Sequence, residues 1–165
     1  MNILITGANG FLGRHFKEYY SGAEHKVFSL GRARLDVTDE KAVEKFFFSN
    51  DIDIVLHTAV KGGRRNESDT LDDFVDNMLM FRNLSRCSGQ YKLMINFGSG
   101  AEFDRSRSIV SAKEAEIYDR TPSDYYGQAK NLIAKEINKY QNIINLRLFG
   151  CFGHHENGAR MIKGN

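Results

Sequence analysis

The N-terminal segment MNILITGANGFLG restricts the fold of this chain more than any other stretch. Its short apolar run, residues 3–5, is followed by glycines spaced G-x-x-G-x-x-G and then by a helical pattern of apolar residues. A strand, a glycine turn and a helix in this order form a common binding site for the phosphates of a dinucleotide. Gly7 allows the tight turn, Gly10 lets a diphosphate approach the main chain, and Gly13 lets the helix pack against the strand.

The helix that starts in this turn adds unpaired N–H groups and the positive end of its dipole, both of which attract phosphate. The spacing differs from the commoner G-x-G-x-x-G, and in a chain with 15 glycines the pattern alone is a weak signal. Its position directly after the first strand favours a dinucleotide site. The residues of the turn that we expect to contact the cofactor are Gly7, Asn9, Gly10, Phe11 and Leu12.

Apolar runs of strand length alternate with helical patterns along the rest of the chain. We expect further strands at residues 25–30, 52–58, 93–97 and 143–148. We also expect Leu12, Phe16 and Tyr19 to share one face of the first helix, and Thr38 to cap the second helix. The alternation predicts an α/β fold, a Rossmann-type doubly wound parallel sheet with helices on both faces. Ligands of such sheets bind at the carboxyl ends of the strands.

Composition limits the classes of function. At 165 residues the chain fits one domain, and its formal net charge of +2 is too small to indicate nucleic acid or an anionic membrane as partner. No apolar run approaches the ~20 residues that span a bilayer. The chain starts directly in the first strand, so we expect no signal peptide. Two cysteines, Cys87 and Cys151, lie far apart, which indicates a reducing compartment and predicts a cytoplasmic protein.

Tyr126 and Lys130 form a Y-x-x-x-K pair on one face of a predicted helix. An ammonium group ~4 Å from a phenol stabilises the phenolate by about 4 kcal/mol, which would lower the pKa of the tyrosine by roughly three units toward neutrality. Such a tyrosine could act as an acid or base. The spacing alone is not specific, because tyrosines and lysines are common in this chain.

Ser99 is expected directly after the fourth strand, between two glycines that expose it. A hydroxyl at that edge of the sheet could hydrogen-bond a substrate carbonyl as charge develops on its oxygen. The alternative is an ordinary turn serine. The glycine turn, this serine and the tyrosine–lysine pair together favour a catalytic site.

These segments resemble the extended short-chain dehydrogenase/reductase family, which includes NAD(P)-dependent nucleotide-sugar epimerases, dehydratases and reductases. The segments that carry the resemblance are TGANGFLG, LHTA, GSG and YGQAK. AVKGG and DNMLMFRNL look most like the GDP-fucose synthases and related deoxysugar reductases of that family. The resemblance implies a nucleotide-sugar substrate and hydride transfer at a sugar carbon.

The resemblance also implies residue roles. Ser99, Tyr126 and Lys130 would form the catalytic triad, in which Tyr126 exchanges a proton while a hydride moves to or from the nicotinamide. Tyr126 and Lys130 would also contact the cofactor, and Lys130 would bind the nicotinamide ribose. The remaining cofactor contacts that it implies are Asp36 and Val37 at the adenine, and Ala59 and Val60 at the ribose and nicotinamide.

Two departures from the family pattern bear on activity. GDP-fucose synthases carry a cysteine and a histidine that assist epimerisation, and the matching positions here are Ala101 and Arg160. Family members also run to roughly twice this length. We therefore expect residues 1–165 to be the NAD(P)-binding domain, with 149–165 starting the connection to a substrate domain that is absent, and the chain alone to be inactive. The alternative is a non-catalytic dinucleotide-binding regulatory module. Members of this family often form dimers, so a homodimer is one possible state.

The end of the predicted second strand bears on cofactor choice. NAD-selective relatives place an acidic residue there to bind the ribose 2′-hydroxyl. Here the position is Gly31, with Arg32 next and Arg34 close by. Guanidinium groups suit a 2′-phosphate, so we predict that NADP is preferred, with NAD still possible.

Other polar groups are weaker candidates. The run His154-His155-Glu156 could suggest a metal, but adjacent histidines rarely converge on one ion, so we expect no metal site. Arg64 and Arg65 could face a substrate phosphate, or could lie in a solvated loop. His57 ends a buried strand and is expected to be packed rather than catalytic.

Overall fold

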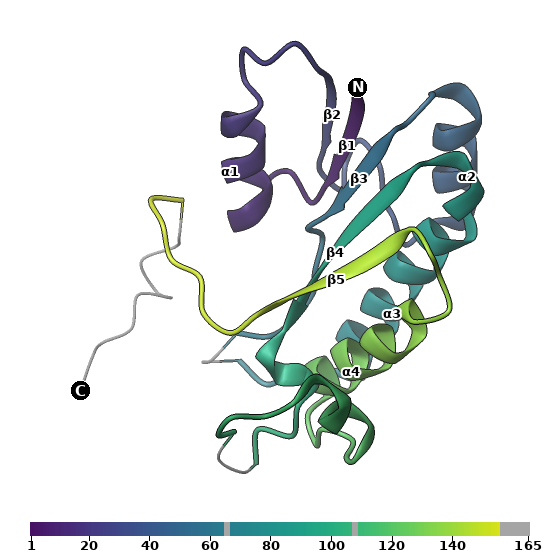
Figure 1. The fold of residues 1–165 in the computed structure, drawn as a ribbon. Helices are drawn as coiled ribbons and strands as arrows, with labels where there is room; N and C mark the ends of the chain where they lie inside the picture. The colour runs from purple at the N-terminus through teal and green to yellow at the C-terminus, as the bar shows by residue number, and fades with distance from the viewer. Residues whose placement is uncertain (65–66, 107–108, 156–165) are drawn as a thin grey trace.

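A sheet of five parallel strands forms the centre of the computed structural model, which describes residues 1–64, 67–106 and 109–155 (Figure 1). The strands are β1 (Asn2–Thr6), β2 (Lys26–Leu30), β3 (Ile54–His57), β4 (Leu93–Ser99) and β5 (Ile143–Leu148). The helices are α1 (Phe11–Tyr19), α2 (Glu40–Ser49), α3 (Leu71–Arg86) and α4 (Tyr125–Ile137). Short 3₁₀ turns lie at Ser88–Gln90, Gly100–Glu102 and Glu114–Tyr118. The predicted strands are all present.

The strand order is β2-β1-β3-β4-β5, with all neighbours parallel. Helix α1 lies on one side of the sheet, and α2, α3 and α4 lie on the other (Figure 1). The predicted doubly wound α/β fold is therefore confirmed. The order reverses between β1 and β3, and in such sheets the crevice outside the carboxyl ends at this reversal is the usual ligand site.

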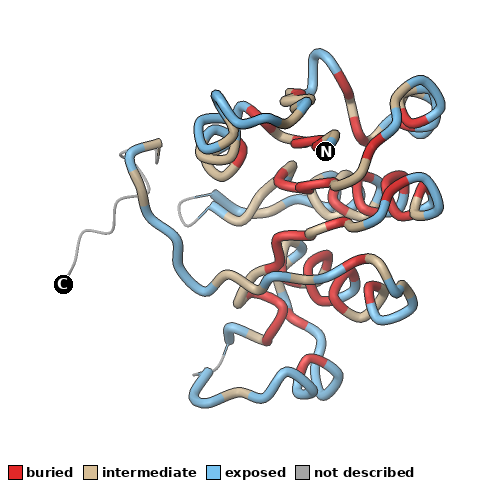
Figure 2. The backbone as a smooth tube through the Cα atoms, turned by 45° about the horizontal axis from the view of Figure 1, so that its top comes forward, coloured by how far each residue is buried: buried red, intermediate tan, exposed pale blue. Residues whose placement is uncertain are grey.

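Each side of the sheet has its own core. Leu4, Val55 and Met94 are fully buried among residues of α2, α3 and α4, while Ile5 packs with the residues of α1 on the opposite side. Successive residues of a strand point to opposite faces, which explains the split between Leu4 and Ile5. Buried residues follow the strands and the inner sides of the helices, and exposed ones follow the loops (Figure 2). Among the helices that the structure describes, none has the length and hydropathy needed to cross a membrane.

Two expectations about helices α1 and α2 were wrong. Leu12 and Phe16 pack against the sheet, but Tyr19 is 77% exposed, and the next residue, Tyr20, takes its place in the core. The N-cap of α2 is Asp39 rather than Thr38, because its carboxylate accepts a hydrogen bond from the N–H of Ala42. The hydroxyl of Thr38 instead donates to Asp36.

Strand β4 is longer than expected and includes Ser99 as its last residue. Ser99 pairs in register with Leu148 of β5, and its side chain caps the 3₁₀ turn that follows. The serine is therefore held by the sheet and is not part of a free turn.

Candidate active site

The turn between β1 and α1 is built from contacts that leave no room for side chains. Gly7 has φ +64°, a conformation that favours glycine, and a Cβ there would lie 2.6 Å from the Cα of Ala59. A Cβ on Gly13 would lie 2.4 Å from the carbonyl oxygen of Gly7. Both glycines are therefore required by close packing, and the main chain of Ala59, after β3, lies directly against the turn.

Helix α1 begins without a side-chain cap, unlike the other three α helices of the described chain. Its N-cap is Gly10 and its first turn contains no acidic residue. The N-termini of α2, α3 and α4 each have an internal acceptor, namely Asp39, Thr70 and Asp124. The first-turn N–H groups of α1, those of Phe11 and Leu12 included, are therefore left to an external acceptor. This N-terminus fits an anionic group such as a diphosphate.

The end of β2 contributes an ion pair. Arg32 Nε donates to Asp36 Oδ2 at 2.9 Å, and both side chains are partly exposed. Asp36 also accepts from the hydroxyl and the N–H of Thr38, and these bonds, with that of Arg32, hold the pKa of Asp36 below its ordinary value. Asn9 lies against Gly31, where a Cβ would be 2.5 Å from its Nδ2.

Val37 differs from its neighbour Asp36. Its side chain is 5% exposed and packs in the core, and its carbonyl accepts a hydrogen bond from Asn83 Nδ2. The side chain of Val37 thus faces the core, whereas that of Asp36 is partly open to solvent. Between them, only Asp36 offers a side chain to a ligand.

The loop after β3 is anchored by Asn77 of α3. Asn77 Nδ2 donates to the carbonyl oxygen of Lys61 at 2.9 Å, and its Oδ1 accepts from the N–H of Lys61 at 3.1 Å. These two hydrogen bonds hold the main chain of Lys61 in place, and with it the preceding residues Ala59 and Val60. Val60 is 46% exposed and so remains accessible beside the glycine turn.

The structure brings Ser99, Tyr126 and Lys130 together at the carboxyl end of β4. The side chain of Ser99 lies close enough to the phenol of Tyr126 to influence its pKa. Lys130, one turn further along α4, is buried, and its Nζ donates to the carbonyl oxygen of Phe97 at 2.8 Å. The same Nζ lies 5.8 Å from the centre of the Tyr126 ring. The three predicted catalytic side chains therefore form one cluster.

The expected lowering of the pKa of Tyr126 by Lys130 is wrong for this structure. Burial raises the pKa of Tyr126, and the nearby side chain of Ser99 only partly opposes this. The ammonium group of Lys130 binds the main chain of β4, and burial lowers its own pKa to about 8. Tyr126 is therefore a neutral phenol at neutral pH, suited to donating a proton.

Glu102 supports the serine and was missed by sequence reasoning. Its side chain is fully buried; Oε1 accepts from the N–H of Ser99 at 2.9 Å, and Oε2 accepts from Arg147 Nε at 2.5 Å. Asn145 Nδ2 donates to the same carboxylate at 3.0 Å. A local signal for this contact exists, since Ser99 and Glu102 form an S-x-x-E capping box.

Comparison with known proteins shows the family to which the chain belongs. The sequence model of the NAD dependent epimerase/dehydratase family matches residues 3–164. The chain belongs to this family. The predicted resemblance to the epimerase/dehydratase type of extended dehydrogenase/reductase is thereby confirmed.

Two similar proteins of this family have names that refer to nucleotide sugars. UDP-glucose 4-epimerase of Caenorhabditis elegans is 26% identical, with 96% of this chain and 56% of the relative aligned. GDP-L-colitose synthase of Yersinia pseudotuberculosis is 23% identical, with 98% of this chain and 58% of the relative aligned. The chain thus spans a little over half the length of these relatives.

Solved structures share the fold. The GDP-mannoheptose C4 reductase of Campylobacter jejuni with NADP bound has a TM-score of 0.78 at 24% identity, covering 88% of this chain and 50% of that one. A dTDP-4-dehydrorhamnose reductase from Clostridium acetobutylicum has a TM-score of 0.76 at 24% identity, covering 89% and 52%. At this identity the likeness shows a common fold.

The other polar residues that the sequence offers as candidates for a functional role are His57, the two loop arginines and Arg160. His57 is 5% exposed and shares a 2.9 Å hydrogen bond with Thr6 Oγ1, and burial lowers its pKa to about 3, so it is packed as expected. Arg64 lines an open hollow beside Tyr125, but it pairs with Glu67. Arg65 and Arg160 lie outside the described residues.

Proposed function

We propose that residues 1–165 are the NAD(P)-binding half of a nucleotide-sugar epimerase, dehydratase or reductase. One observation carries the proposal: the uncapped N-terminus of α1 and the Ser99–Tyr126–Lys130 cluster lie at the same edge of one parallel sheet. The first feature suits a dinucleotide phosphate, and the second suits proton exchange with a substrate oxygen. The family match and the descriptions of the relatives support a nucleotide-sugar substrate.

The cofactor would lie along the carboxyl ends of the strands. The diphosphate would bind the turn of Gly7, Asn9, Gly10, Phe11 and Leu12, and the adenosine end would lie near Arg32, Asp36 and the main chain of Val37. The nicotinamide end would lie near Ala59 and Val60, with Lys130 binding its ribose. The glycine packing and the uncapped N-terminus of α1 support the position of the diphosphate.

A nicotinamide held by these residues would supply or accept a hydride at a sugar carbon. Tyr126 transfers a proton at the oxygen of that carbon, and Ser99 donates a hydrogen bond to the same oxygen. Because burial keeps the phenol of Tyr126 protonated, the arrangement favours proton donation, the step that reduction of a ketone requires. Lys130 offers a buried cation with a lowered pKa beside this phenol.

Tyr126→Phe tests the proton transfer. In a longer protein that carries this chain and a substrate domain, we expect the variant to lower kcat at least about 10²-fold, the usual scale of general acid–base catalysis. The Kd for NADPH, measured by fluorescence titration, should change less than about twofold. Tyr125→Phe is the matched control, because Tyr125 is the adjacent tyrosine and does not share the Ser99 contact. Equal activity of the two variants would remove Tyr126 from the mechanism.

The second candidate is a non-catalytic dinucleotide-binding module, which would need only the close-packed glycine turn and the uncapped N-terminus of α1. It predicts NADPH binding by the longer protein without turnover on any nucleotide sugar. The same assay therefore separates the two candidates.

Arg32→Ala tests the cofactor preference. We propose that NADPH binds more tightly than NADH, because a guanidinium group can grip a 2′-phosphate. Arg32 already pairs with Asp36, so we expect the variant to weaken NADPH about 10-fold and to leave NADH within about twofold. Arg82→Ala, an exposed charge loss on α3, is the control. Tighter binding of NADH by the parent, with NADPH unaffected in Arg32→Ala, would contradict the preference.

A further inference from the structure

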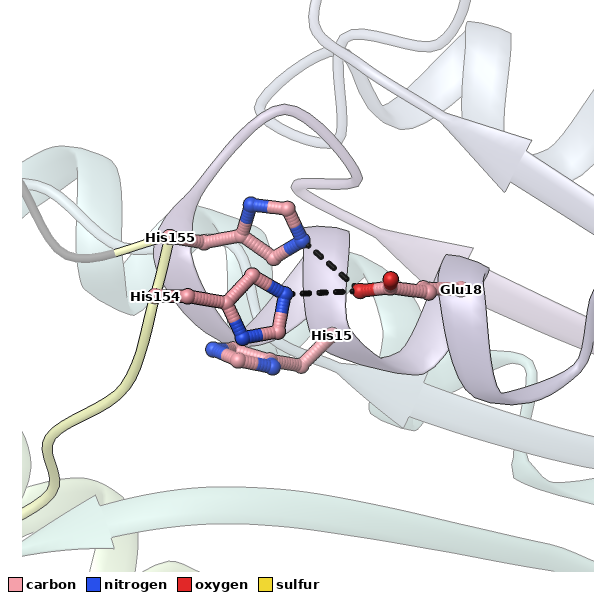
Figure 3. A group of neighbouring side chains, drawn as sticks. All are labelled: His15, Glu18, His154 and His155. Carbon is pink, nitrogen blue, oxygen red and sulfur yellow. Dashed lines mark hydrogen bonds and ion pairs between the residues drawn. The ribbon is translucent and has the colours of Figure 1, made fainter.

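Four side chains from opposite ends of the described chain meet beside α1 (Figure 3). His15 and Glu18 lie on α1, three residues apart and so on the same side of the helix. His154 and His155 come from the segment after β5. Each of the four residues offers one ligand atom, and these atoms all lie within 4.8 Å of one another.

The adjacent histidines converge, contrary to the expectation from their spacing. His154 Nε2 and His155 Nε2 lie 2.9 and 3.0 Å from Glu18 Oε2, and their ring centres are 4.1 Å apart. The ring centre of His15 lies 4.6 and 4.7 Å from those of His154 and His155. A turn in the main chain at these two residues brings both rings to the same carboxylate. His15 and Glu18 therefore join the two adjacent histidines, a grouping that the sequence does not reveal.

The ring of His15 has a nitrogen whose hydrogen-bonding capacity is not satisfied. Its Nε2 is buried and has no hydrogen-bond partner among the described residues. A Cβ at residue 153 would lie 2.7 Å from this nitrogen, so glycine at that position lets the segment close over the ring. Burying a polar nitrogen without a partner costs free energy, and a ligand bound to the imidazole would offset that cost.

We propose that His15, Glu18, His154 and His155 form a binding site for a divalent transition-metal ion of the Zn²⁺ type. Three imidazole nitrogens and one carboxylate oxygen are a donor set that Zn²⁺ accepts with tetrahedral geometry, whereas Ca²⁺ and Mg²⁺ prefer oxygen ligands. Metal–ligand bonds of about 2.0–2.2 Å place tetrahedral ligand atoms about 3.4 Å apart. The cluster needs side-chain movements of about an ångström to reach this spacing.

The charge of the cluster suits a cation. Glu18 brings the one carboxylate of the cluster, and both adjacent histidine rings approach its Oε2. A bound ion would tie the segment after β5 to α1, the helix whose other end is the proposed phosphate site. The site is distinct from the Ser99–Tyr126–Lys130 cluster and does not depend on the proposed function.

Metal titration of the untagged, chelator-treated chain tests the site. We expect one Zn²⁺ per chain in competition with a chromophoric chelator, and a visible absorption band of four-coordinate Co²⁺ when Co²⁺ is used instead. Loss of outer partners of a metal ligand alone weakens binding 10–100-fold, so His15→Gln and Glu18→Gln should each weaken Zn²⁺ at least about 100-fold. His25→Gln, a histidine outside the cluster, should bind like the parent.

The His15 and Glu18 variants distinguish a four-ligand site from metal binding by His154 and His155 alone. Circular dichroism melting in the presence of chelator shows that each variant is folded before it is titrated. Zn²⁺ affinity that is unchanged in His15→Gln and Glu18→Gln but lost in the double variant His154→Gln/His155→Gln would overturn the four-ligand site. Failure of the parent to bind Zn²⁺ or Co²⁺ would overturn it as well.

Discussion

Replacing Glu102 with alanine is expected to lower the free energy of unfolding by at least about 3 kcal/mol. Glu102 is fully buried and accepts hydrogen bonds from Ser99, Asn145 and Arg147. The variant leaves the N–H of Ser99 without its acceptor and removes the buried partner of a guanidinium group whose side chain is only 12% exposed. Removing one member of a buried ion pair is costly because the remaining charge stays desolvated.

Urea unfolding of the chain at neutral pH measures this loss, and Glu114→Ala is the matched control. Glu114 pairs with the same Arg147, at 2.8 Å, but its side chain is 91% exposed. An exposed ion pair contributes little, so we expect the control to change the free energy of unfolding by less than about 1 kcal/mol. Similar small losses in both variants would show that burial of Glu102 does not contribute to stability.

The elements that the sequence predicts well depend on short-range patterns. The strand at residues 143–148 was expected with the bounds that the structure has, because polar residues precede it and a glycine-rich segment starts at Phe149. Gly7 and Gly13 were expected to allow a tight turn and close packing, and added Cβ atoms at both positions collide with main-chain atoms. These are local constraints, and the local sequence carries them.

Contacts between distant residues could not be predicted in the same way. Glu102 and Arg147 are separated by 45 residues, and Glu18 and His154 by 136, so no spacing in the sequence relates them. The pKa of Tyr126 depends on how deeply the folded chain buries its side chain, and the Y-x-x-x-K spacing does not specify that depth. Only the tertiary fold decides such properties.

Gly10→Asp is expected to weaken cofactor binding roughly 10³-fold while the chain stays folded. Gly10 has φ −79° and ψ 176°, which any residue adopts, and an added Cβ would meet only the carbonyl oxygen of Gly7, at 3.2 Å. Aspartate is a favourable N-cap, so its carboxylate would bind the first-turn N–H groups of α1 and stabilise the helix. The same carboxylate would occupy the proposed phosphate position.

The magnitude follows from the charge. A carboxylate about 4 Å from a phosphate oxygen, at an effective dielectric constant near 20, costs about 4 kcal/mol, which corresponds to roughly a 10³-fold loss of affinity. Gly89→Asp is the control, because it adds the same charge at an exposed position where an added Cβ meets nothing within 4 Å. Its affinity for the cofactor should equal that of the parent.

Fluorescence titration of the parent, Gly10→Asp and Gly89→Asp with NADPH, paired with thermal melting, tests most directly whether the β1–α1 turn holds the dinucleotide. The proposed site predicts NADPH binding by the parent and by Gly89→Asp. It also predicts that Gly10→Asp loses about 10³-fold in affinity while its melting temperature equals or exceeds that of the parent. NADPH binding by Gly10→Asp as tight as that of the parent would contradict the site.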